Sequence, residues 1–522
     1  MKNYFLCLVS LLVACSSQTS LPSIALPTET IIPNPSSTPV PSPIPTLAPS
    51  PTFDPFIRID GVEWPSEAVI SPLELENISG GELSAKGPWM ILEGGPNLII
   101  IDSAGGVQSK NSSEDYPFFN RLYIPSPTGG LVAFVDTENY EFTLHIFSFP
   151  NLEILTLMDL TPYFPDVIDD SFASEELEGD RYLSALGGPV WSRNGKLLAY
   201  IASPDVNPDL FLYSIEANEI KRISKEDGRA LNPVWSPDDQ YIFFEVVGST
   251  NFGKSGAGYS DISKWAVNIA EGGEAYKLID GLGYGYEHFI GWESSRTALI
   301  DSEQWWAGNF HLRTIDIESG VEEIIWCPVY GGRAYDPKSN QVLLYYPGEL
   351  EHGPDVELTC EEDDLQPGLY LVSLDTGKIK HLQDLELENY MEGGAYVQIE
   401  WIPQRNAFWI EISEVMYEVT LTGKFELIPI NPMNEWEVSS DGSKVLEYGR
   451  DGMNLYLKDW KLVTIETNKV HAAFWGPYGS AVYIISFGKS LLDVYVARPP
   501  TYELELLIED VDIFFPGKWV MP

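Results

Sequence analysis

Basic residues are scarce in this sequence. Lys and Arg number 31 against 77 Asp and Glu in 522 residues, which leaves a formal net charge of −46. A chain this acidic repels nucleic acid and anionic lipid headgroups, so we expect no nucleic-acid partner. Cationic partners, divalent ions and neutral glycans stay compatible with the charge. So does an acidic surface that serves only solubility outside the cell.

Residues in catalytic or metal-binding spacing are also scarce. The chain has no G-x-S-x-G nucleophile elbow, and its six histidines share no metal-ligand spacing. Asp205, Asn207 and Asp209 begin a D-x-N-x-D calcium loop, but Leu210 stands where that loop needs glycine. A plain polar hairpin is the alternative reading of these three residues. We therefore expect no metal site and no cofactor.

No apolar run after the first fifteen residues, MKNYFLCLVSLLVAC, is long enough for a transmembrane helix. Within those fifteen, Lys2 precedes an apolar run over 4–13 that has the length of a signal-peptide core. Its end, Leu12-Val13-Ala14-Cys15, resembles the bacterial lipoprotein cleavage motif. The resemblance implies cleavage before Cys15, a lipid on its thiol and an extracytoplasmic protein anchored to a bacterial membrane, on its cell-surface or periplasmic side. An ordinary secretory signal and an uncleaved anchor are the alternatives.

Residues 16–56 are dominated by Pro, Ser and Thr with few charges, as in PNPSSTPVPSPIPTLAPSP. Proline removes backbone donors and favours the polyproline II conformation, so this stretch cannot pack a core. We interpret it as a disordered stalk that joins the lipid anchor to a folded domain over 57–522. That domain is rich in Trp, Tyr and Phe and is therefore globular.

A repeated unit dominates residues 57–522. Each copy reads apolar strand, tight turn, apolar strand, and the turn contains the Pro, Asp, Asn and Gly residues that turns favour. Two more alternating strands joined by a short turn follow most copies, which predicts four-stranded antiparallel units. The copies are IPSPTGGLVAFVD (124–136), GPVWSRNGKLLAYIA (188–202), NPVWSPDDQYIFFEV (232–246), FIGWESSRTALID (289–301), GRAYDPKSNQVLLYY (332–346), IEWIPQRNAFWIEI (399–412), WEVSSDGSKVLEYG (436–449) and AFWGPYGSAVYIIS (473–486).

The copy PVWSPDDQYIFF resembles the TolB-like, WD40-like β-propeller repeat. The resemblance covers about residues 80–522 and implies an all-β propeller of four-stranded blades. It is nearly silent on function, because propellers serve many unrelated ones. The segments GPWMILEGGPNLIIIDSAGG (87–106) and VDIFFPGKWVMP (511–522) could together complete one blade and close the ring. The eight copies and this closing blade would together make nine blades, but nine-bladed propellers are rare. We predict eight, with seven and nine as alternatives.

The stretch GSTNFGKS (248–255) matches the phosphate-binding pattern G-x-x-x-x-G-K-[ST]. A phosphate loop requires a following helix whose amides hold the phosphates. Residues 256–275 instead begin with two glycines and continue into a strand-like run, ISKWAVNI. We therefore expect a loop between the second and third strands of a blade, and no bound nucleotide.

Insertions are predicted on one face of the ring only. The segments 159–187, 248–260, 281–288, 302–309, 347–367 and 384–396 all connect the second strand to the third or the fourth to the next blade. Insertions confined to one face are typical of a binding face. The candidate binding residues are Phe252, Tyr259, Tyr284, Tyr286, Trp305, Trp306 and Tyr390. Burial beneath the loops is the alternative role for these aromatic side chains.

Cys327 and Cys360 remain after Cys7 leaves with the signal and Cys15 takes the lipid. Both are predicted on the same face, in connections of neighbouring blades, and exported proteins keep disulfides. We predict a Cys327–Cys360 disulfide, with two free thiols as the alternative.

The sequence therefore predicts a lipid-anchored, non-catalytic binding or scaffold module for a protein or polysaccharide at the cell envelope. The alternative is a propeller glycosidase or lyase, which would need paired carboxylates facing inward from the first strands of the blades. Most of these strands are apolar, with Glu400 and Glu437 as exceptions.

Overall fold

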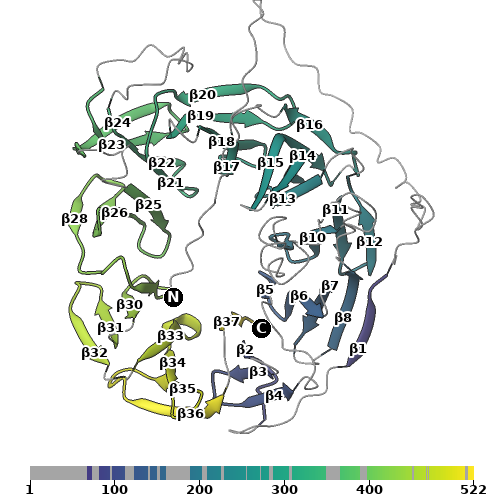
Figure 1. Cartoon of the computed structure of the whole chain (residues 1–522), viewed down its shortest axis with the longest axis vertical. Helices are drawn as coiled ribbons and strands as arrows, with labels where there is room; N and C mark the ends of the chain where they lie inside the picture. The colour runs from purple at the N-terminus through teal and green to yellow at the C-terminus, as the bar shows by residue number, and fades with distance from the viewer. Residues whose placement is uncertain are drawn as a thin grey trace, which may run out of the picture.

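The protein is described by a computed structural model, which covers residues 67–72, 82–94, 97–111, 123–138, 141–149, 153–159, 188–202, 209–224, 229–253, 256–270, 272–280, 286–304, 308–348, 365–387, 397–449, 452–465, 467, 469–511 and 515–522. The predicted signal (1–15) and stalk (16–56) lie outside these residues. The described strands form nine antiparallel sheets arranged in a ring, as Figure 1 shows. The β-propeller prediction is therefore confirmed.

Each blade runs from an inner strand near the axis to an outer strand at the rim (Figure 1). We number the blades in ring order. Blade 1 contains β37 (Phe515–Val520), β2 (Trp89–Gly94), β3 (Asn97–Asp102) and β4 (Val107–Asn111). Blade 2 contains β5 (Tyr123–Pro125), β6 (Leu131–Glu138), β7 (Glu141–Ser148), β8 (Glu153–Asp159) and a fifth, outermost strand, β1 (Val69–Pro72). Blade 3 contains β9 (Val190–Trp191), β10 (Leu197–Ala202), β11 (Asp209–Ser214) and β12 (Glu219–Arg222).

Blades 4 to 6 follow the same order from axis to rim. Blade 4 contains β13 (Arg229–Trp235), β14 (Tyr241–Gly253), β15 (Gly256–Asn268) and β16 (Tyr276–Ile279). Blade 5 contains β17 (Tyr286–Trp292), β18 (Thr297–Gln304), β19 (Gly308–Asp316) and β20 (Glu322–Trp326). Blade 6 contains β21 (Gly332–Asp336), β22 (Gln341–Tyr346), β23 (Gly368–Ser373) and β24 (Lys378–Asp384).

Blades 7 to 9 complete the ring. Blade 7 contains β25 (Val397–Ile402), β26 (Ala407–Ile412), β27 (Val415–Thr420) and β28 (Phe425–Leu427). Blade 8 contains β29 (Glu435–Val438), β30 (Lys444–Gly449), β31 (Gly452–Leu457) and β32 (Leu462–Ile465). Blade 9 contains β33 (Val470–Trp475), β34 (Val482–Phe487), β35 (Leu492–Ala497) and β36 (Leu504–Val511), with a short 3₁₀ turn, η2 (Pro477–Gly479), between its first two strands.

The preferred count of eight blades is wrong, and the alternative of nine is correct. Each of the eight repeat copies forms a blade of its own. The two ends of the propeller build the ninth, because β37 pairs with β2 in a register that places Val520 opposite Trp89. The predicted closure of the ring by its terminal segments is therefore confirmed. It adds a complete blade because residues 97–111 supply two further strands.

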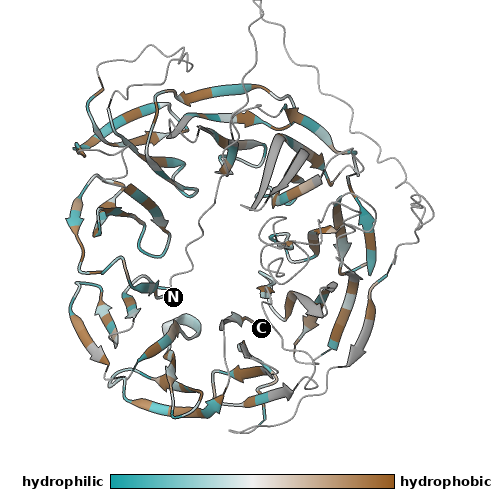
Figure 2. Cartoon of the chain, in the orientation of Figure 1, coloured by the Kyte–Doolittle hydropathy of each residue, from teal (hydrophilic) through white to brown (hydrophobic). Residues whose placement is uncertain are grey.

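The core is divided among the blade interfaces. Nine clusters of buried hydrophobic residues lie one between each pair of neighbouring blades. Strand β10 shows why: Leu198 and Tyr200 pack towards blade 2, and Ala199 and Ile201 pack towards blade 4. A strand covered on both faces must be apolar at successive positions, which explains runs such as LLAYIA. Figure 2 shows this apolar colour on strands around the ring.

An aromatic residue at the end of the inner strand joins one blade to the one before it. The indole Nε1 of Trp235 donates to the carbonyl oxygen of Val190 at 3.0 Å, and that of Trp475 donates to Glu437 at 3.1 Å. Trp191 and Trp519 make the corresponding bonds, and the Tyr335 hydroxyl makes one to the carbonyl of Trp292. This contact gives the aromatic position of the repeat its structural role.

The tight turn after the inner strand of blade 4 also contacts the preceding blade. In blade 4 the carboxylate of Asp239, at φ +60°, accepts from the backbone amides of Arg193 (2.6 Å) and Asn194 (2.9 Å) in blade 3. The buried Ser236 hydroxyl closes the same turn by donating to Asp238 at 2.7 Å. The S-P-D-x sequence therefore shapes the turn and also ties it to its neighbour.

Strand β1 was not predicted. Val69 pairs with Thr156, so β1 covers the outer edge of blade 2. Ala68 is buried in the cluster between blades 2 and 3, and its amide donates to Asn218 of blade 3 at 3.3 Å. The described chain thus begins at the rim of the ring, clamped across two blades.

Candidate functional site

The antiparallel order within each blade places two kinds of connection on opposite faces of the ring. We call the loop face the one that carries connections from the second strand to the third and from the fourth to the next blade. The other is the turn face. The described turn-face connections are short, as predicted. On the loop face, the segments 160–187, 349–364 and 388–396 lie outside the described residues.

Three of the predicted insertions contain several strand residues, and two others, 159–187 and 384–396, begin with the last residue of β8 and of β24. Residues 248–253 and 256–260 continue β14 and β15, residues 286–288 begin β17, and residues 302–304 and 308–309 belong to β18 and β19. These parts of the loop prediction are wrong. Backbone pairing across the hairpins continues past the body of the blade, and no local sequence signal marks where such pairing stops.

The three predicted binding residues that the structure describes lie on strands of blades 4 and 5. Phe252 lies on β14, Tyr259 lies on β15, and Tyr286 is the first residue of β17. Tyr284, Trp305, Trp306 and Tyr390 lie outside the described residues, as does Lys254 of the phosphate-loop match. Blades 4 and 5, whose strands carry Phe252, Tyr259 and Tyr286, are neighbours in the ring (Figure 1).

The chain around the phosphate-loop match forms an antiparallel hairpin. β14 and β15 are paired from Tyr241 opposite Asn268 as far as Gly253 opposite Gly256. A strand, β15, therefore stands where a phosphate loop needs the first turn of a helix. The prediction that a strand follows this stretch is confirmed.

A buried lysine anchors this hairpin to the next blade. The side chain of Lys264 on β15 is 0% exposed, although the charged end of a lysine normally stays in water. Its Nζ forms an ion pair with Glu245 on β14 and donates to the backbone carbonyl of Glu287 on β17 at 2.6 Å. Asn232, on the inner strand β13, donates to the same Glu245 carboxylate at 2.8 Å.

The ion pairs continue into blade 5. Arg313 on β19 forms an ion pair with Glu287 and donates to Ser302 Oγ at 2.8 Å. Its Nε also lies 2.7 Å from Oε2 of Glu322 at the rim. Burial raises the pKa of the Glu287 carboxyl, while the charges of Arg313 and Lys264 oppose the rise. The Oε2 atom of Glu287 is buried and has no hydrogen-bond partner among the described residues.

A second group of ion pairs joins blade 5 to blade 6. Arg333 on β21 holds both carboxylate oxygens of Asp301 on β18, at 2.9 Å and 2.6 Å, and the Tyr330 hydroxyl donates to the same carboxylate. Asp301 is 0% exposed, and burial raises its pKa. We call the whole set the blade 4–6 charge network. It comprises Glu245, Lys264, Glu287, Asp301, Arg313, Glu322 and Arg333.

This network was not predicted from the sequence. The signal was present, because single charged residues interrupt apolar strands: Glu245 in YIFFEVV, Lys264 in ISKWAVNI and Arg313 in HLRTID. Buried charges need partners, so each one predicts another nearby. The two contacts that join blades, Lys264 to Glu287 and Arg333 to Asp301, could not be deduced, since their partners lie on different blades.

The inner-strand carboxylates of the enzyme alternative do not form a pair. Glu437 on β29 turns to blade 9, where its Oε2 accepts from the backbone amide of Trp475 at 2.8 Å. Burial raises its pKa to about 7. Burial also raises the pKa of Glu400 on β25. Glu400 lies on blade 7 and Glu437 on blade 8.

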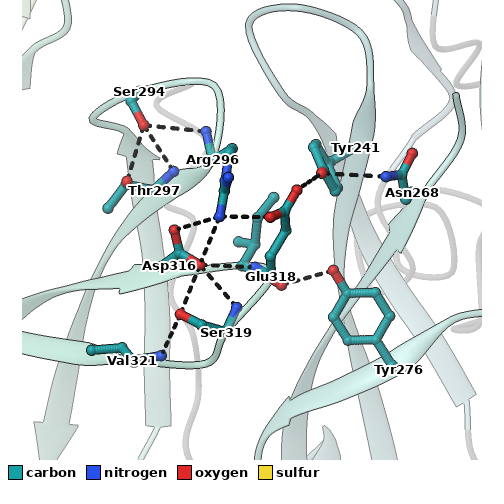
Figure 3. Close-up of polar contacts among 11 residues, drawn as sticks. Tyr241, Asn268, Tyr276, Ser294, Arg296, Thr297, Asp316, Glu318, Ser319 and Val321 are labelled. Atoms are coloured by element: carbon teal, nitrogen blue, oxygen red, sulfur yellow. Dashed lines mark hydrogen bonds and ion pairs between the residues drawn. The ribbon is translucent and has the colours of Figure 1, made fainter. Parts of the chain in front are cut away.

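Structural contacts occupy the turn face between blades 4 and 5 (Figure 3). The Tyr241 hydroxyl forms a hydrogen bond to the Glu318 carboxylate, which raises the pKa of the tyrosine to about 12. Arg296 forms an ion pair with Glu318 at 2.6 Å, and the Tyr276 hydroxyl donates to the carbonyl of Ile317 at 2.7 Å. These bonds join the two blades on the face opposite the candidate binding residues.

Asp209 of the candidate calcium loop is engaged inside blade 3. Its buried carboxylate forms an ion pair with Arg222 and accepts from Ser224 Oγ at 3.0 Å. Asp205 and Asn207 lie outside the described residues. Among the residues that the structure does describe, no group of three or more His, Cys, Asp or Glu is placed to hold a metal ion.

The structure describes only one of the two cysteines predicted to pair. Cys327, which follows β20 on the loop face, is disulfide-bonded. Cys360 lies outside the described residues, so its pairing with Cys327 stays a prediction. The same is true of the lipid on Cys15. Within the described ranges, no helix has the length and apolar character needed to cross a membrane.

Comparison with known proteins identifies the fold and no family. No family model matches the sequence, and no curated protein is similar to it. Among solved structures, a eukaryotic initiation factor is similar to this chain with a TM-score of 0.50 and 11% identity, over 84% of this chain and 98% of its own. Oligogalacturonate lyase from Vibrio parahaemolyticus is 15% identical over 61% of this chain and 91% of its own, with a TM-score of 0.35. Dipeptidyl peptidase 4 from Porphyromonas gingivalis is 10% identical over 83% of this chain and 67% of its own, with a TM-score of 0.46. At these identities the likeness extends to the fold alone.

Proposed function

We propose that this protein is a lipid-anchored, extracytoplasmic β-propeller that binds a protein or polysaccharide at the cell envelope and carries out no chemistry of its own. The observation that carries the proposal is the loop face of blades 4 and 5. There β14–β15, the longest hairpin among the described strands, stands beside the strands that lead to the predicted aromatic residues. TolB-like and WD40-like propellers, which the repeat resembles, are consistent with a binding role.

The blade 4–6 charge network supports this reading. Lys264 links the hairpin that carries Phe252 and Tyr259 to the start of β17, which carries Tyr286. A buried, multiply bonded lysine resists motion between the two blades at the base of the hairpin, which limits the entropy that binding must remove.

The alternative is a propeller enzyme that acts on glycans, and one observation favours it. A pKa of about 7 suits Glu437 for proton transfer at neutral pH. A glycosidase nevertheless needs a second carboxyl within roughly 5–10 Å of the first. The Glu437 carboxylate is instead bonded to the backbone amide of Trp475 in blade 9, so we place binding first.

The test is binding of the purified chain to a glycan array and to an array of synthetic basic peptides. The Trp305→Ala/Trp306→Ala variant is expected to lose binding at least tenfold. Leu462→Ala, an exposed rim residue of blade 8, serves as the matched control and should bind normally. Turnover of an array glycan that Glu437→Gln abolishes would establish the enzyme alternative instead.

The anchor is tested separately. The lipid motif predicts that the mature protein partitions with membranes through Cys15. Cys15→Ser should release the protein or leave its signal uncleaved, as judged by membrane fractionation and by the mass of the purified chain. A Ser variant that stays membrane-bound with normal processing would contradict the lipoprotein proposal.

A further inference from the structure

The β14–β15 hairpin projects beyond the rest of blade 4. β13 pairs with β14 only as far as Val247, and β16 pairs with β15 only between Lys264 and Ala266. Past these points β14 and β15 pair with each other alone, from Ser249 opposite Ser260 to Gly253 opposite Gly256. We call residues 248–253 and 256–263 the ribbon. Among the described residues, no third strand pairs with either of its edges.

Unpaired strand edges attract other strands, and proteins usually protect them with lysine, proline or irregular pairing. Other edges of this ring carry such protection. β24 at the rim of blade 6 has Lys378, Lys380 and a register shift, the outermost strand of blade 2 ends at Pro72, and β36 has two register shifts.

The ribbon has none of these devices. Its residues, GSTNFG and GAGYSDIS, include no proline and one charge, Asp261. Its pairing from Ser249 to Gly253 proceeds without a register shift. A two-stranded ribbon is only marginally stable alone in water, and an added strand would stabilise it. The ring already contains one such addition, since β1 pairs with the outer edge of blade 2.

We propose that the ribbon is a strand-addition site, which binds an extended, uncharged or basic peptide segment of a partner protein through main-chain hydrogen bonds. The inference rests on the proposed binding function and narrows its ligand from protein or polysaccharide to protein. Main-chain pairing supplies affinity in this mode of recognition, and neighbouring side chains supply selectivity.

Charge and composition favour a partner peptide over two other occupants, a second copy of the chain and the chain's own segment 16–56. A second copy of the chain has the same net charge of −46, which opposes self-association. The chain's own segment 16–56 is rich in proline, which cannot donate to a strand ladder. A peptide without acidic residues meets neither obstacle, and the acidic surface attracts a basic one.

The experiment selects peptides from a library of ten-residue sequences without Asp, Glu or Pro on the immobilised mature chain. Selected peptides are then titrated against the mature chain and a trimmed variant. In the variant an Asn-Gly turn replaces residues 248–261 and joins Val247 to Ile262, which already face each other. We expect at least tenfold weaker binding to the trimmed variant. Peptides N-methylated at alternate residues should lose binding to the mature chain by a similar factor, and this arm leaves the protein unaltered.

Equal affinity for the trimmed variant, or no effect of N-methylation, would overturn the inference. A concentration-dependent dimer that trimming abolishes would assign the ribbon to a second copy and overturn it too. If Trp305→Ala/Trp306→Ala abolishes ligand binding while the trimmed variant retains it, the proposed function stands and the strand-addition site fails. If no array ligand or peptide binds, the proposed function itself fails.

Discussion

At the scale of single residues, Glu437 shows how position in the ring changes a carboxyl group. Its backbone carbonyl accepts the indole bond of Trp475, and its carboxylate accepts the amide of the same residue. Both bonds cross from blade 8 to blade 9. Burial is the larger influence on this carboxyl and raises its pKa, while the hydrogen bond from the Trp475 amide opposes the rise.

We predict that Glu437→Gln stabilises the protein at alkaline pH. The folded chain keeps a proton on Glu437 up to about pH 7, whereas the ordinary pKa of the group is 4.5. The stability that Glu437 contributes is therefore full below pH 4.5 and is lost as pH rises through 7. Glutamine stays neutral and can still accept from Trp475.

Thermal unfolding from pH 4 to pH 9 measures the effect. The variant should be more stable than the wild type by roughly 1–2 kcal/mol at pH 8 and indistinguishable from it near pH 4. A stability difference that does not change with pH would show that Glu437 remains ionised throughout.

A second prediction concerns Lys264. Lys264→Met removes the cation from Glu245 and the donor from the carbonyl of Glu287, and the loss should be about 2–4 kcal/mol of unfolding free energy. The double variant Lys264→Met/Glu245→Gln removes both charges together and should recover most of that loss. Urea titration of the two variants measures the difference. Equal stability of the single and double variants would mean that water solvates the Glu245 carboxylate once the lysine is removed.

At the scale of elements, the turns after the inner strands form contacts between blades as well as reversing the chain. Gly442, in the turn of blade 8, has φ +68°, and a Cβ there would lie 2.0 Å from the carbonyl oxygen of Gln404 in blade 7. Gly377, in a turn of blade 6, has a similar φ of +62° with no atom within 4 Å. Substitution of these two glycines therefore separates the cost of backbone strain from the cost of a clash between blades.

We therefore predict that Gly442→Ala costs about 3 kcal/mol or more and Gly377→Ala only about 1 kcal/mol. Both variants place alanine in the left-handed region, but only the first also forces two blades apart. Urea denaturation of each variant gives the two values. Similar losses would show that the turn of blade 8 moves away from blade 7 at little cost.

At the scale of the whole molecule, closure of the ring depends on its last strand. β37 is the inner strand of blade 1, Trp519 donates to the carbonyl of Trp475 in blade 9, and the amide of Gly130 in blade 2 donates to Met521 at 2.7 Å. The C-terminus thus ties three successive blades together.

Deletion of residues 512–522 should abolish cooperative unfolding and expose the inner edge of β2 to aggregation. Deletion of residues 67–72 is the matched control, because it removes β1 and the buried Ala68 from the rim but leaves the ring closed, and its effect should be smaller. Light scattering and thermal unfolding distinguish the two. A synthetic peptide of residues 512–522, added in trans, should restore part of the lost stability. Normal unfolding of the C-terminal deletion would contradict a role of β37 in closure.

The sequence by itself determined the all-β propeller, the four-stranded blade and the closure by both ends. Each of these follows from local signals, namely two-residue alternation, the S-P-D-x turns and the aromatic position before them. Only the tertiary structure decided that the blades number nine, because the ninth requires Trp89 and Val520, from opposite ends of the propeller, to pair. It alone decided how far β14 and β15 extend, since pairing between strands is not encoded in either strand separately. The charge network also required it: Lys264 and Arg333 find their partners on other strands and other blades, and no spacing along the chain specifies those contacts.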